Sequence, residues 1–330
     1  ENDLFKITNN LKNGFFCIDN STCSIFEEAI IRSKFKIIQK IDPIYNFKSI
    51  KNKIEIRNTL KAHIEDGVAM TKFLYWFKNN KKELTEKKVE TKLQKIRKKS
   101  KNYLFPSFDT IAGSGPNGAI IHYKSNRKTN RKIEKDDILL LDSGGQYKWG
   151  TTDITRTICS GKVSNIIKNN FTRVLKGHIA VITCNLKKLF NGHLIDNLAR
   201  KPLNKVGLNY SHGTGHGVGF FLNVHEGPQG ISKNNKINLK EGMILSNEPG
   251  YYLKNNYGIR IENLIYIAKE KKKLIFKNLT YAPIDVDMIN FNMMSVIEKK
   301  YLFDYHLDVY SKLSKFLNNS EKKWLINLIK

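Results

Sequence analysis

The sequence predicts an α+β domain in which helices alternate with antiparallel strands. Two observations lead to this prediction. Segments with apolar residues at helical spacing are separated by short apolar runs of strand length, and two such strands flank glycines typical of a hairpin. The composition allows a large core, because 40% of the 330 residues are hydrophobic and 11% are aromatic.

The helices are predicted from apolar periodicity and from residues that can cap their first turns. Between Lys48 and Phe77, apolar residues recur at helical spacing. Thr85 and Ser164 each carry a hydroxyl that can accept a hydrogen bond from the backbone at a helix start. The predicted helical segments are 48–77, 85–99, one that starts at Ser164, one from Asn191 to just before Gly207, and two within 292–330.

Two acidic residues lie on the predicted hairpin. Ile138 to Ser143 is a short apolar run, typical of a buried strand, and it contains Asp142. Asp153 to Ile158 alternates polar and apolar residues, which is typical of a second strand. A hairpin formed by these strands brings Asp142 and Asp153 side by side.

Three further candidate ligands follow along the chain. Met243 to Asn247 is predicted to be a strand that delivers Glu248 just before a Pro-Gly turn, which stops the strand. The alternation from Ile259 to Glu262 points the isoleucines to the core and Arg260 and Glu262 to the site. His216 lies in the glycine-rich segment 212–219, which resembles a phosphate loop but lacks the Lys-Ser/Thr ending of a P-loop.

Four carboxylates and one imidazole are too much negative charge to bury together without cations, because each unpaired buried carboxylate costs several kcal/mol. A pair of divalent metal ions is therefore predicted. Carboxylates with one imidazole and no thiolate favour Mn²⁺, with Co²⁺ or Zn²⁺ as alternatives. Such a pair activates a shared water, from which Glu248 or a neighbouring carboxylate can take a proton. His122, His212 and His225 are candidates for stabilising a tetrahedral intermediate and moving protons.

Four segments of the sequence resemble those of a known family: 115–123, the hairpin with Asp142 and Asp153, 212–228 and 246–263. In them the chain resembles the metallopeptidases of the pita-bread fold, and among these the cytosolic Xaa-Pro aminopeptidases of eukaryotes. The resemblance extends from about Ile50 to the C-terminus. It departs at 276–280, which reads Phe-Lys-Asn-Leu-Thr where the family has Phe-Glu-Pro-Leu-Thr, and no ligand is lost there.

The resemblance implies a pita-bread catalytic domain that removes the N-terminal residue from peptides with proline in second position. By the family pattern, Asp153 and Glu262 bridge the two metal ions, and Glu248 also helps to activate the bridging water. His122 and His225 would contact the substrate and its transition state. His212 and Arg260 would help to orient the site without binding the metal ions themselves. The implied metal ligands are Asp142, Asp153, His216, Glu248 and Glu262.

Two other functions remain open. The first is a pita-bread binding module without catalysis, but such relatives usually lose ligands, and all five are present here. The second is a methionine aminopeptidase, which shares the ligand order. The phrases 212–228 and 258–263 resemble the proline-specific branch more closely.

The resemblance also suggests a division of the chain. Residues 1–46 are expected to be the remnant of a preceding creatinase-like N-terminal domain with its linker, and residues 47–330 the catalytic domain. A helical extension from about 292 to 330 completes it and is expected to form a homodimer, as in relatives of this type. The apolar residues expected to be exposed there are Tyr301, Phe303, Tyr305, Leu313, Phe316, Trp324 and Leu328.

The net charge of +27 is unusual, but it comes from lysines that occur with asparagine and isoleucine throughout the chain. This pattern indicates compositional drift, and no nucleic-acid partner is expected, because an arginine-rich groove with interleaved aromatics is missing. No apolar run approaches the ~20 residues that span a bilayer, so no membrane association is expected. Four scattered cysteines fit a reducing compartment, and a cytoplasmic location is predicted.

Overall fold

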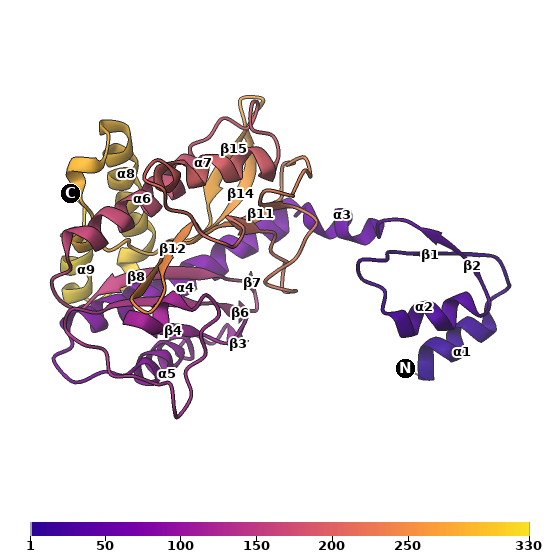
Figure 1. The fold of residues 1–330 in the computed structure, drawn as a ribbon, viewed down its shortest axis with the longest axis horizontal. Coiled ribbons are helices and arrows are strands. Elements are labelled where there is room, and N and C mark those ends of the chain that lie inside the picture. The colour runs from indigo at the N-terminus through magenta and orange to yellow at the C-terminus, as the bar shows by residue number, and fades with distance from the viewer. Residues whose placement is uncertain (1, 330) are drawn as a thin grey trace. The chain divides into compact units, whose positions relative to one another are not determined.

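The computed structural model describes residues 2–329, which divide into two compact units (Figure 1). Residues up to Lys48 form the first unit, and residues from Ser49 onward form the second. In the first unit, helices α1 (Asn2–Asn10) and α2 (Ile25–Arg32) accompany two parallel strands, β1 (Phe15–Ile18) and β2 (Lys36–Gln39). Its small core contains Ile18, Ile31 and Phe35. Helix α3 (Pro43–Ser49) leads to the second unit.

The first half of the second unit is a sheet covered by two helices. The sheet has the order β4-β5-β8, formed by β4 (Ile111–Ser114), β5 (Ile138–Ser143) and β8 (Ile154–Cys159), all antiparallel. Helices α4 (Lys53–Asn79) and α5 (Glu86–Arg97) cover it, and their apolar side chains meet those of the strands in one core cluster. A smaller sheet beside it contains β3 (Tyr103–Pro106), β6 (Gly145–Tyr147) and β7 (Gly150–Thr151).

The second half repeats this arrangement. Strands β11 (Ile244–Asn247), β14 (Asn263–Glu270) and β15 (Lys273–Asn278) form an antiparallel sheet in the order β11-β14-β15. Helices α6 (Asn165–Ile182) and α7 (Gly192–Asn204) pack on it (Figure 1). Two short hairpins complete this half, formed by β9 (Gly215–His216) with β10 (Gly230–Ile231) and by β12 (Gly250–Leu253) with β13 (Tyr257–Arg260).

The two halves are joined along β8. The Thr157 hydroxyl donates to the backbone oxygen of Arg260 and accepts from its backbone N–H, at 2.9 and 3.0 Å. The Glu262 N–H donates to the backbone oxygen of Thr155 at 3.1 Å. These bonds hold the segment 260–262 against the strand that follows Asp153, so acidic residues from both halves meet at one seam.

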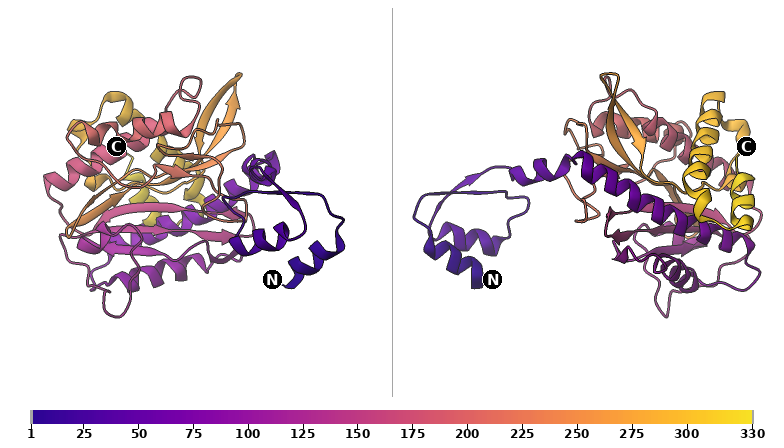
Figure 2. Two further views of the ribbon diagram at one scale, coloured as in Figure 1. Left: turned by 45° about the vertical axis from the view of Figure 1, so that its right-hand side comes forward. Right: turned by 180° about the vertical axis from the view of Figure 1, so that it is seen from behind.

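The C-terminal region contains α8 (Val296–Leu313) and α9 (Asn319–Ile326), and each helix starts with a capping box. In each, the side chain of the cap residue accepts a hydrogen bond from the backbone N–H of a glutamate three residues on, and the side chain of that glutamate accepts one from the backbone N–H of the cap residue. Figure 2 shows both helices beside the end of α4. The expected apolar surface is wrong for most of its residues. Tyr305 and Leu313 are buried, and Tyr301, Trp324 and Leu328 are half-buried against the core. Only Phe303 and Phe316 of this set are exposed, at 41% and 47%.

The architecture confirms the α+β class, with one local correction. Strands β5 and β8 pair as predicted, but β6 and β7 lie between them in the chain, so the connection is longer than a simple hairpin. Strand β6 pairs with β3 on one side and with β7 on the other. Strand β11 ends at Asn247, just before Glu248 and the Pro249-Gly250 turn, as predicted, and β12 starts at Gly250 in another sheet. Among the described residues, no helix is both long and apolar enough to cross a membrane.

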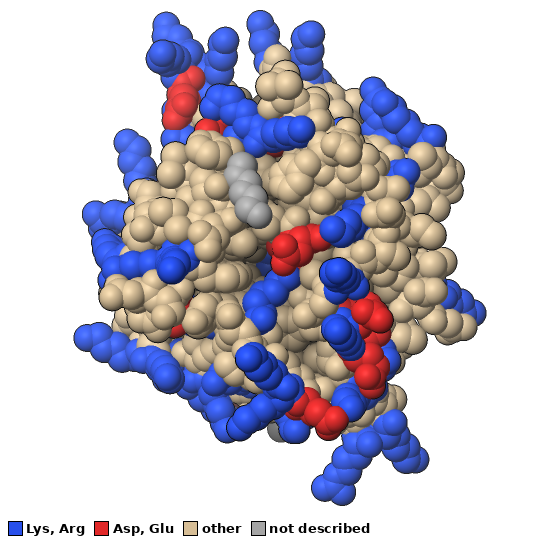
Figure 3. Space-filling view, turned by 90° about the vertical axis from the view of Figure 1, so that its left-hand side faces the viewer, with Lys and Arg blue, Asp and Glu red and all other residues tan. Residues whose placement is uncertain are grey.

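Lysine and arginine side chains are spread over the surface. Figure 3 shows them scattered across one face, with fewer acidic side chains among them. Several stand alone at the edge of this face and do not line a groove. On the face that Figure 3 shows, this distribution fits compositional drift better than selection for one polyanion site.

Candidate metal centre

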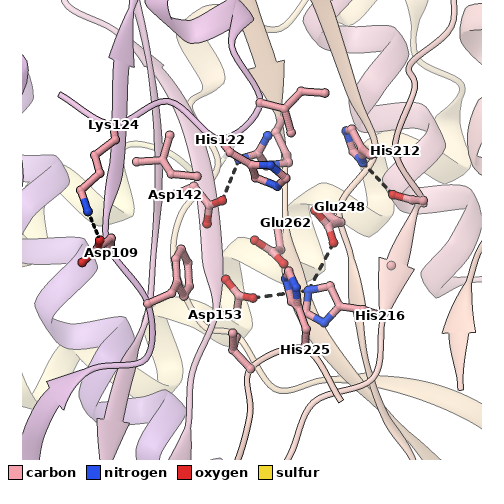
Figure 4. Close-up of a pocket in the computed structure, with 17 residues that line it drawn as sticks. Asp109, His122, Lys124, Asp142, Asp153, His212, His216, His225, Glu248 and Glu262 are labelled. Atoms are coloured by element: carbon pink, nitrogen blue, oxygen red, sulfur yellow. Dashed lines mark hydrogen bonds and ion pairs between the residues drawn. The ribbon is translucent and has the colours of Figure 1, made fainter. Parts of the chain in front are cut away.

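Five side chains from five separate segments meet at the seam between the two halves. Asp142 comes from β5, Asp153 precedes β8, His216 ends β9, Glu248 follows β11, and Glu262 lies between β13 and β14. One ligand atom each from Asp142, Asp153 and Glu262 lies within 4.8 Å of the others, and the same holds for His216, Glu248 and Glu262. Figure 4 shows the carboxylates of Asp153, Glu248 and Glu262 turned toward the ring of His216.

The carboxylates are buried and lack sufficient counter-charge. Asp142, Asp153 and Glu262 are 9%, 3% and 1% exposed. Asp142 Oδ1 and Asp153 Oδ1 are buried without a hydrogen-bond partner among the described residues. Burial raises the pKa of Asp153 and of Glu262 well above the usual range, and neighbouring carboxylates raise it further. Because such groups are stable as anions only beside cations, the donor set fits divalent metal ions.

The histidine of the cluster is oriented as a ligand. His216 Nε2 lies 3.5 Å from Asp153 Oδ2 and 3.4 Å from Glu248 Oε1. Its Nδ1 is 3.0 Å from the Gly217 carbonyl oxygen, which can only accept a hydrogen bond. Nδ1 therefore carries the proton, and the Nε2 lone pair faces the carboxylates, as metal-binding histidines require.

Two buried hydroxyls hold the ligands in place. The Thr155 hydroxyl donates to Glu262 Oε2 at 2.8 Å, and it accepts from Arg260 Nε at 3.2 Å. The Ser246 hydroxyl donates to Glu248 Oε1 at 3.0 Å and accepts from the backbone N–H of His216 at 2.9 Å. Sequence reasoning missed both hydroxyls as site residues. Their position on strands that carry ligands was the available signal.

A hydrogen-bonded chain links Asp142 to His212. Arg260 is 2% exposed, and its NH2 lies 2.7 Å from Asp142 Oδ2, while its NH1 donates to the Tyr252 hydroxyl at 2.6 Å. That hydroxyl lies 2.8 Å from His212 Nε2, whose ring donates through Nδ1 to the Gly213 carbonyl at 2.7 Å. The Tyr252 hydroxyl therefore donates to Nε2. Sequence reasoning did not identify Tyr252.

The protonation states in this chain follow from burial and from Arg260. Burial lowers the pKa of His212 to about 4, and the positive charge of Arg260 contributes. Burial also raises the pKa of Tyr252 to about 12, although Arg260 opposes the increase. Near neutral pH the imidazole is therefore uncharged, and the phenol keeps its proton.

His122 and His225 lie on the wall of the cleft that contains the five candidate ligands, which are four carboxylates and one imidazole. The cleft has a volume of about 570 Å³, and both side chains are exposed to it. The His225 ring centroid is 4.0 Å from that of His216. The structure thus brings together all the predicted site residues, with the ligands at the floor and two histidines on the wall (Figure 4).

The rim of the cleft combines apolar and charged side chains. Phe108 and Val224 line it, and Asp109 forms an ion pair with Lys124 at the mouth. Both charged side chains are more than 70% exposed, at 77% and 75%. Such an exposed pair contributes little to folding, so these two side chains can exchange partners with a bound ligand.

A second acidic cluster, formed by Cys159, Asp285 and Asp287, already contains a cation. Lys78 Nζ lies 2.6 Å from Asp285 Oδ2 and 3.0 Å from Asp287 Oδ2. Burial is the largest single influence and lowers the pKa of Lys78, but Asp285, Cys159 and Asp287 together outweigh it and raise that pKa above its usual value. This cluster is therefore an ion-pair network and not a candidate metal site.

The family profiles that match the sequence and the proteins that are similar to it point to the same group of enzymes. The sequence matches the profile of metallopeptidase family M24 over residues 57–269, and that of the C-terminal region of peptidase_M24 over residues 272–330. It is 41% identical over 314 residues to a protein named probable Xaa-Pro aminopeptidase P from Laccaria bicolor, covering 90% of this chain and 49% of that protein. It is 42% identical over 313 residues to Xaa-Pro aminopeptidase 1 of Dictyostelium discoideum, covering 89% and 50%. The chain thus spans about half the length of the curated relatives it matches.

A solved structure is similar in fold as well. The X-prolyl aminopeptidase from Caenorhabditis elegans, described as a cytosolic enzyme with a di-nuclear active site, matches with a TM-score of 0.90 and 31% identity. The match covers 100% of this chain and 57% of that one. The pita-bread fold predicted from the sequence is confirmed by this similarity.

Proposed function

The chain belongs to metallopeptidase family M24, and on that premise we propose that it is an aminopeptidase that removes the N-terminal residue from peptides with proline in second position. The observation that carries the proposal is the convergence of Asp142, Asp153, His216, Glu248 and Glu262 on one cleft. The names of the relatives and of the solved C. elegans structure support the specificity for proline.

We propose that these five residues hold two divalent metal ions. Asp153, His216 and Glu262 each belong to two of the overlapping groups of candidate ligands. Of these three, only the two carboxylates have a second oxygen with which to bind a second ion, which supports a bridging role for Asp153 and Glu262. The hard donor set favours Mn²⁺, with Co²⁺ or Zn²⁺ as alternatives. When bound, such a pair acts as a Lewis acid toward a peptide carbonyl and a water molecule. Elemental analysis of the purified protein is expected to give two divalent ions per chain, and trace metal with no gain on adding Mn²⁺ would contradict this.

The other residues of the cleft bind and move protons. Glu248 is held through Oε1 by Ser246, and its side chain is 17% exposed, so it can accept a proton from a water in the cleft. His122 and His225 can donate hydrogen bonds to a reacting peptide from the wall. Arg260 holds Asp142 directly through its ion pair. The Tyr252 hydroxyl connects Arg260 to His212 and so fixes this part of the cleft wall.

The preference for proline has a physical basis. A bond to proline is a tertiary amide without an N–H group. A buried site that offers no acceptor at that nitrogen leaves the N–H of any other residue unpaired, which costs ~1–3 kcal/mol. That cost alone corresponds to a preference of roughly 5- to 150-fold for proline.

Two alternatives are separated by one assay with metal-loaded protein. Faster release of methionine from Met-Ala-Ser than of arginine from Arg-Pro-Pro would indicate a methionine aminopeptidase. Cleavage of neither peptide, with both metal ions bound, would favour a binding module without catalysis.

Assembly, domain division and location are further parts of the proposal. Residues 47–330 would form the catalytic domain, and residues 1–46 a separate creatinase-like unit, which the division of contacts after Lys48 supports. A homodimer would use α8 and α9, where Phe303 and Phe316 are exposed. Light scattering that shows a monomer at micromolar concentration would contradict it. A cytoplasmic location is supported by the four unpaired cysteines.

A further inference from the structure

A buried carboxylate lies behind the loop that carries His122. Glu86 is the first residue of α5, directly after the N-cap Thr85, and its side chain is 0% exposed. In sequence it is an ordinary acidic residue in the first turn of a helix, where it complements the helix dipole. In the structure it points away from solvent and into the segment between β4 and β5.

Each oxygen of this carboxylate accepts hydrogen bonds from that segment. Oε1 accepts from the Ser114 backbone N–H at 2.8 Å and from the Asn117 amide at 3.0 Å. Oε2 lies 2.7 Å from the Tyr123 hydroxyl and 3.2 Å from the Arg131 backbone N–H. Ser114 ends β4, Asn117 lies in the 3₁₀ helix Gly115–Ala119, and Tyr123 directly follows His122. A single side chain therefore connects the start, the middle and the end of the loop.

These contacts determine where His122 points. Tyr123 is 5% exposed and packs in a core cluster with Ile111 and Leu140. Since Tyr123 is fixed toward the interior, its neighbour His122 is presented to the cleft. The opposite side of the loop is fixed too, because Gly118 approaches Gly258 so closely that a Cβ on Gly258 would lie 1.7 Å from the Gly118 oxygen.

We propose that Glu86 is a positioning residue for His122, which it holds at the cleft by accepting hydrogen bonds at Ser114, Asn117 and Tyr123. The inference rests on the proposed peptidase function, since it gives His122 a role in turnover. Glu86 does not line the cleft and contacts none of the proposed metal ligands. The backbone N–H groups of Ser114 and Arg131 and the Asn117 amide can only donate, so both oxygens of Glu86 must be acceptors. The Tyr123 hydroxyl can donate either to Oε2 or to the Thr129 carbonyl oxygen, which lies 2.8 Å away.

The substitution that isolates this role is Glu86→Gln. It keeps the shape of the side chain but places an NH₂ group against hydrogen-bond donors, which leaves at least one of them unpaired. A misplaced catalytic group can lower the rate by about 10²-fold for a shift of 1 Å. We expect kcat to fall by about 10- to 100-fold with metal content unchanged and KM altered by less than about threefold.

A double-mutant cycle with His122→Ala separates positioning from general destabilisation. If Glu86 acts through His122, Glu86→Gln lowers kcat in the wild-type background but by less than about threefold in the His122→Ala background. Equal losses in the two backgrounds would overturn the proposal. Glu83→Gln is the matched control, because Glu83 is an exposed carboxylate just before α5 that pairs with Lys132, and its removal is expected to leave kcat unchanged.

Two additions keep the test decisive. If Glu86→Gln does not fold, Tyr123→Phe removes one of the contacts while keeping the buried ring, and it is expected to lower kcat in the same direction and with the same dependence on His122. Hydrogen–deuterium exchange of residues 114–123 needs no activity. Faster exchange there in Glu86→Gln than in the wild type supports the proposal, and unchanged exchange overturns it. If the metal-loaded wild type cleaves no peptide, the proposed function fails, and exchange alone decides the role of Glu86.

Discussion

Replacing Thr155 by valine is expected to weaken metal binding without changing the fold. The Thr155 hydroxyl donates to Glu262 Oε2 at 2.8 Å and accepts from Arg260 Nε at 3.2 Å. Valine has nearly the same shape but no hydroxyl, so Thr155→Val leaves both partners without this contact. Thr155 is 0% exposed and Glu262 is 1% exposed, so water has little access to replace the hydroxyl.

The magnitude follows from the type of contact. A hydrogen bond to a charged group is worth about 1.5–3 kcal/mol. At 1.4 kcal/mol for each factor of ten, this corresponds to a loss of about 10- to 100-fold in affinity for the metal ion that Glu262 binds. Losses of about this size are typical when a group that orients a metal ligand is removed.

The assay is a competition titration of metal-free protein against a Mn²⁺-binding dye. Thr155→Ser is the control, because it keeps the hydroxyl and removes only a methyl group, and it is expected to bind Mn²⁺ within about threefold of the wild type. Two results would refute the reasoning: Thr155→Val binding as tightly as the wild type, or Thr155→Ser losing as much affinity as Thr155→Val.

Three further outcomes are expected. Glu248→Gln is expected to lower kcat by at least ~10²-fold, as measured on a proline peptide, because it removes the proton acceptor; near-normal turnover would place that role elsewhere. His122→Ala and His225→Ala are expected to lower kcat while elemental analysis shows unchanged metal content, and loss of metal in either variant would make that residue a ligand or a structural support. Asp66 on α4 and Arg97 at the end of α5 form a buried ion pair, with Asp66 Oδ1 2.7 Å from Arg97 Nε. Asp66→Asn leaves Arg97 buried without its charge partner, so urea unfolding is expected to show a loss of about 3–5 kcal/mol in the free energy of unfolding, and a change below about 1 kcal/mol would contradict this.

Features that depend on local sequence were predictable. Thr85, Ser164 and Asn191 are the N-caps of α5, α6 and α7, because a short polar side chain before an apolar periodic segment suffices to start a helix. The bounds of β5 were predicted as Ile138 to Ser143, since a short apolar run needs no further context. The candidate ligands were found because each lies in a sequence segment that matches a motif of the family.

Features that depend on contacts between distant residues were not predictable. The Thr155 hydroxyl meets Glu262 across 107 positions, and the Tyr252 hydroxyl meets His212 across 40. Neither residue type is unusual in a strand, so the local sequence indicates at most that Thr155 lies near a candidate ligand, and not which distant side chain it contacts. Glu86 is a further example: an acidic residue in the first turn of a helix is expected to be exposed, but Glu86 is buried.

The expected apolar surface on the last helices was wrong for a related reason. Composition shows that Tyr305 and Leu313 are apolar, but not that α8 packs on α4 and α6 and buries them. Amphipathic spacing gives the face of a helix that seeks burial, while the partner that covers it depends on the whole fold.

Specificity for proline is measured most directly by comparing two initial rates. In each, protein loaded with Mn²⁺ releases arginine, from Arg-Pro-Pro in one and from Arg-Ala-Ala in the other. We expect a preference of roughly 5- to 150-fold or more for the proline peptide, because only the tertiary amide leaves no buried N–H unpaired. Equal rates for the two peptides, or faster cleavage of Arg-Ala-Ala, would contradict it.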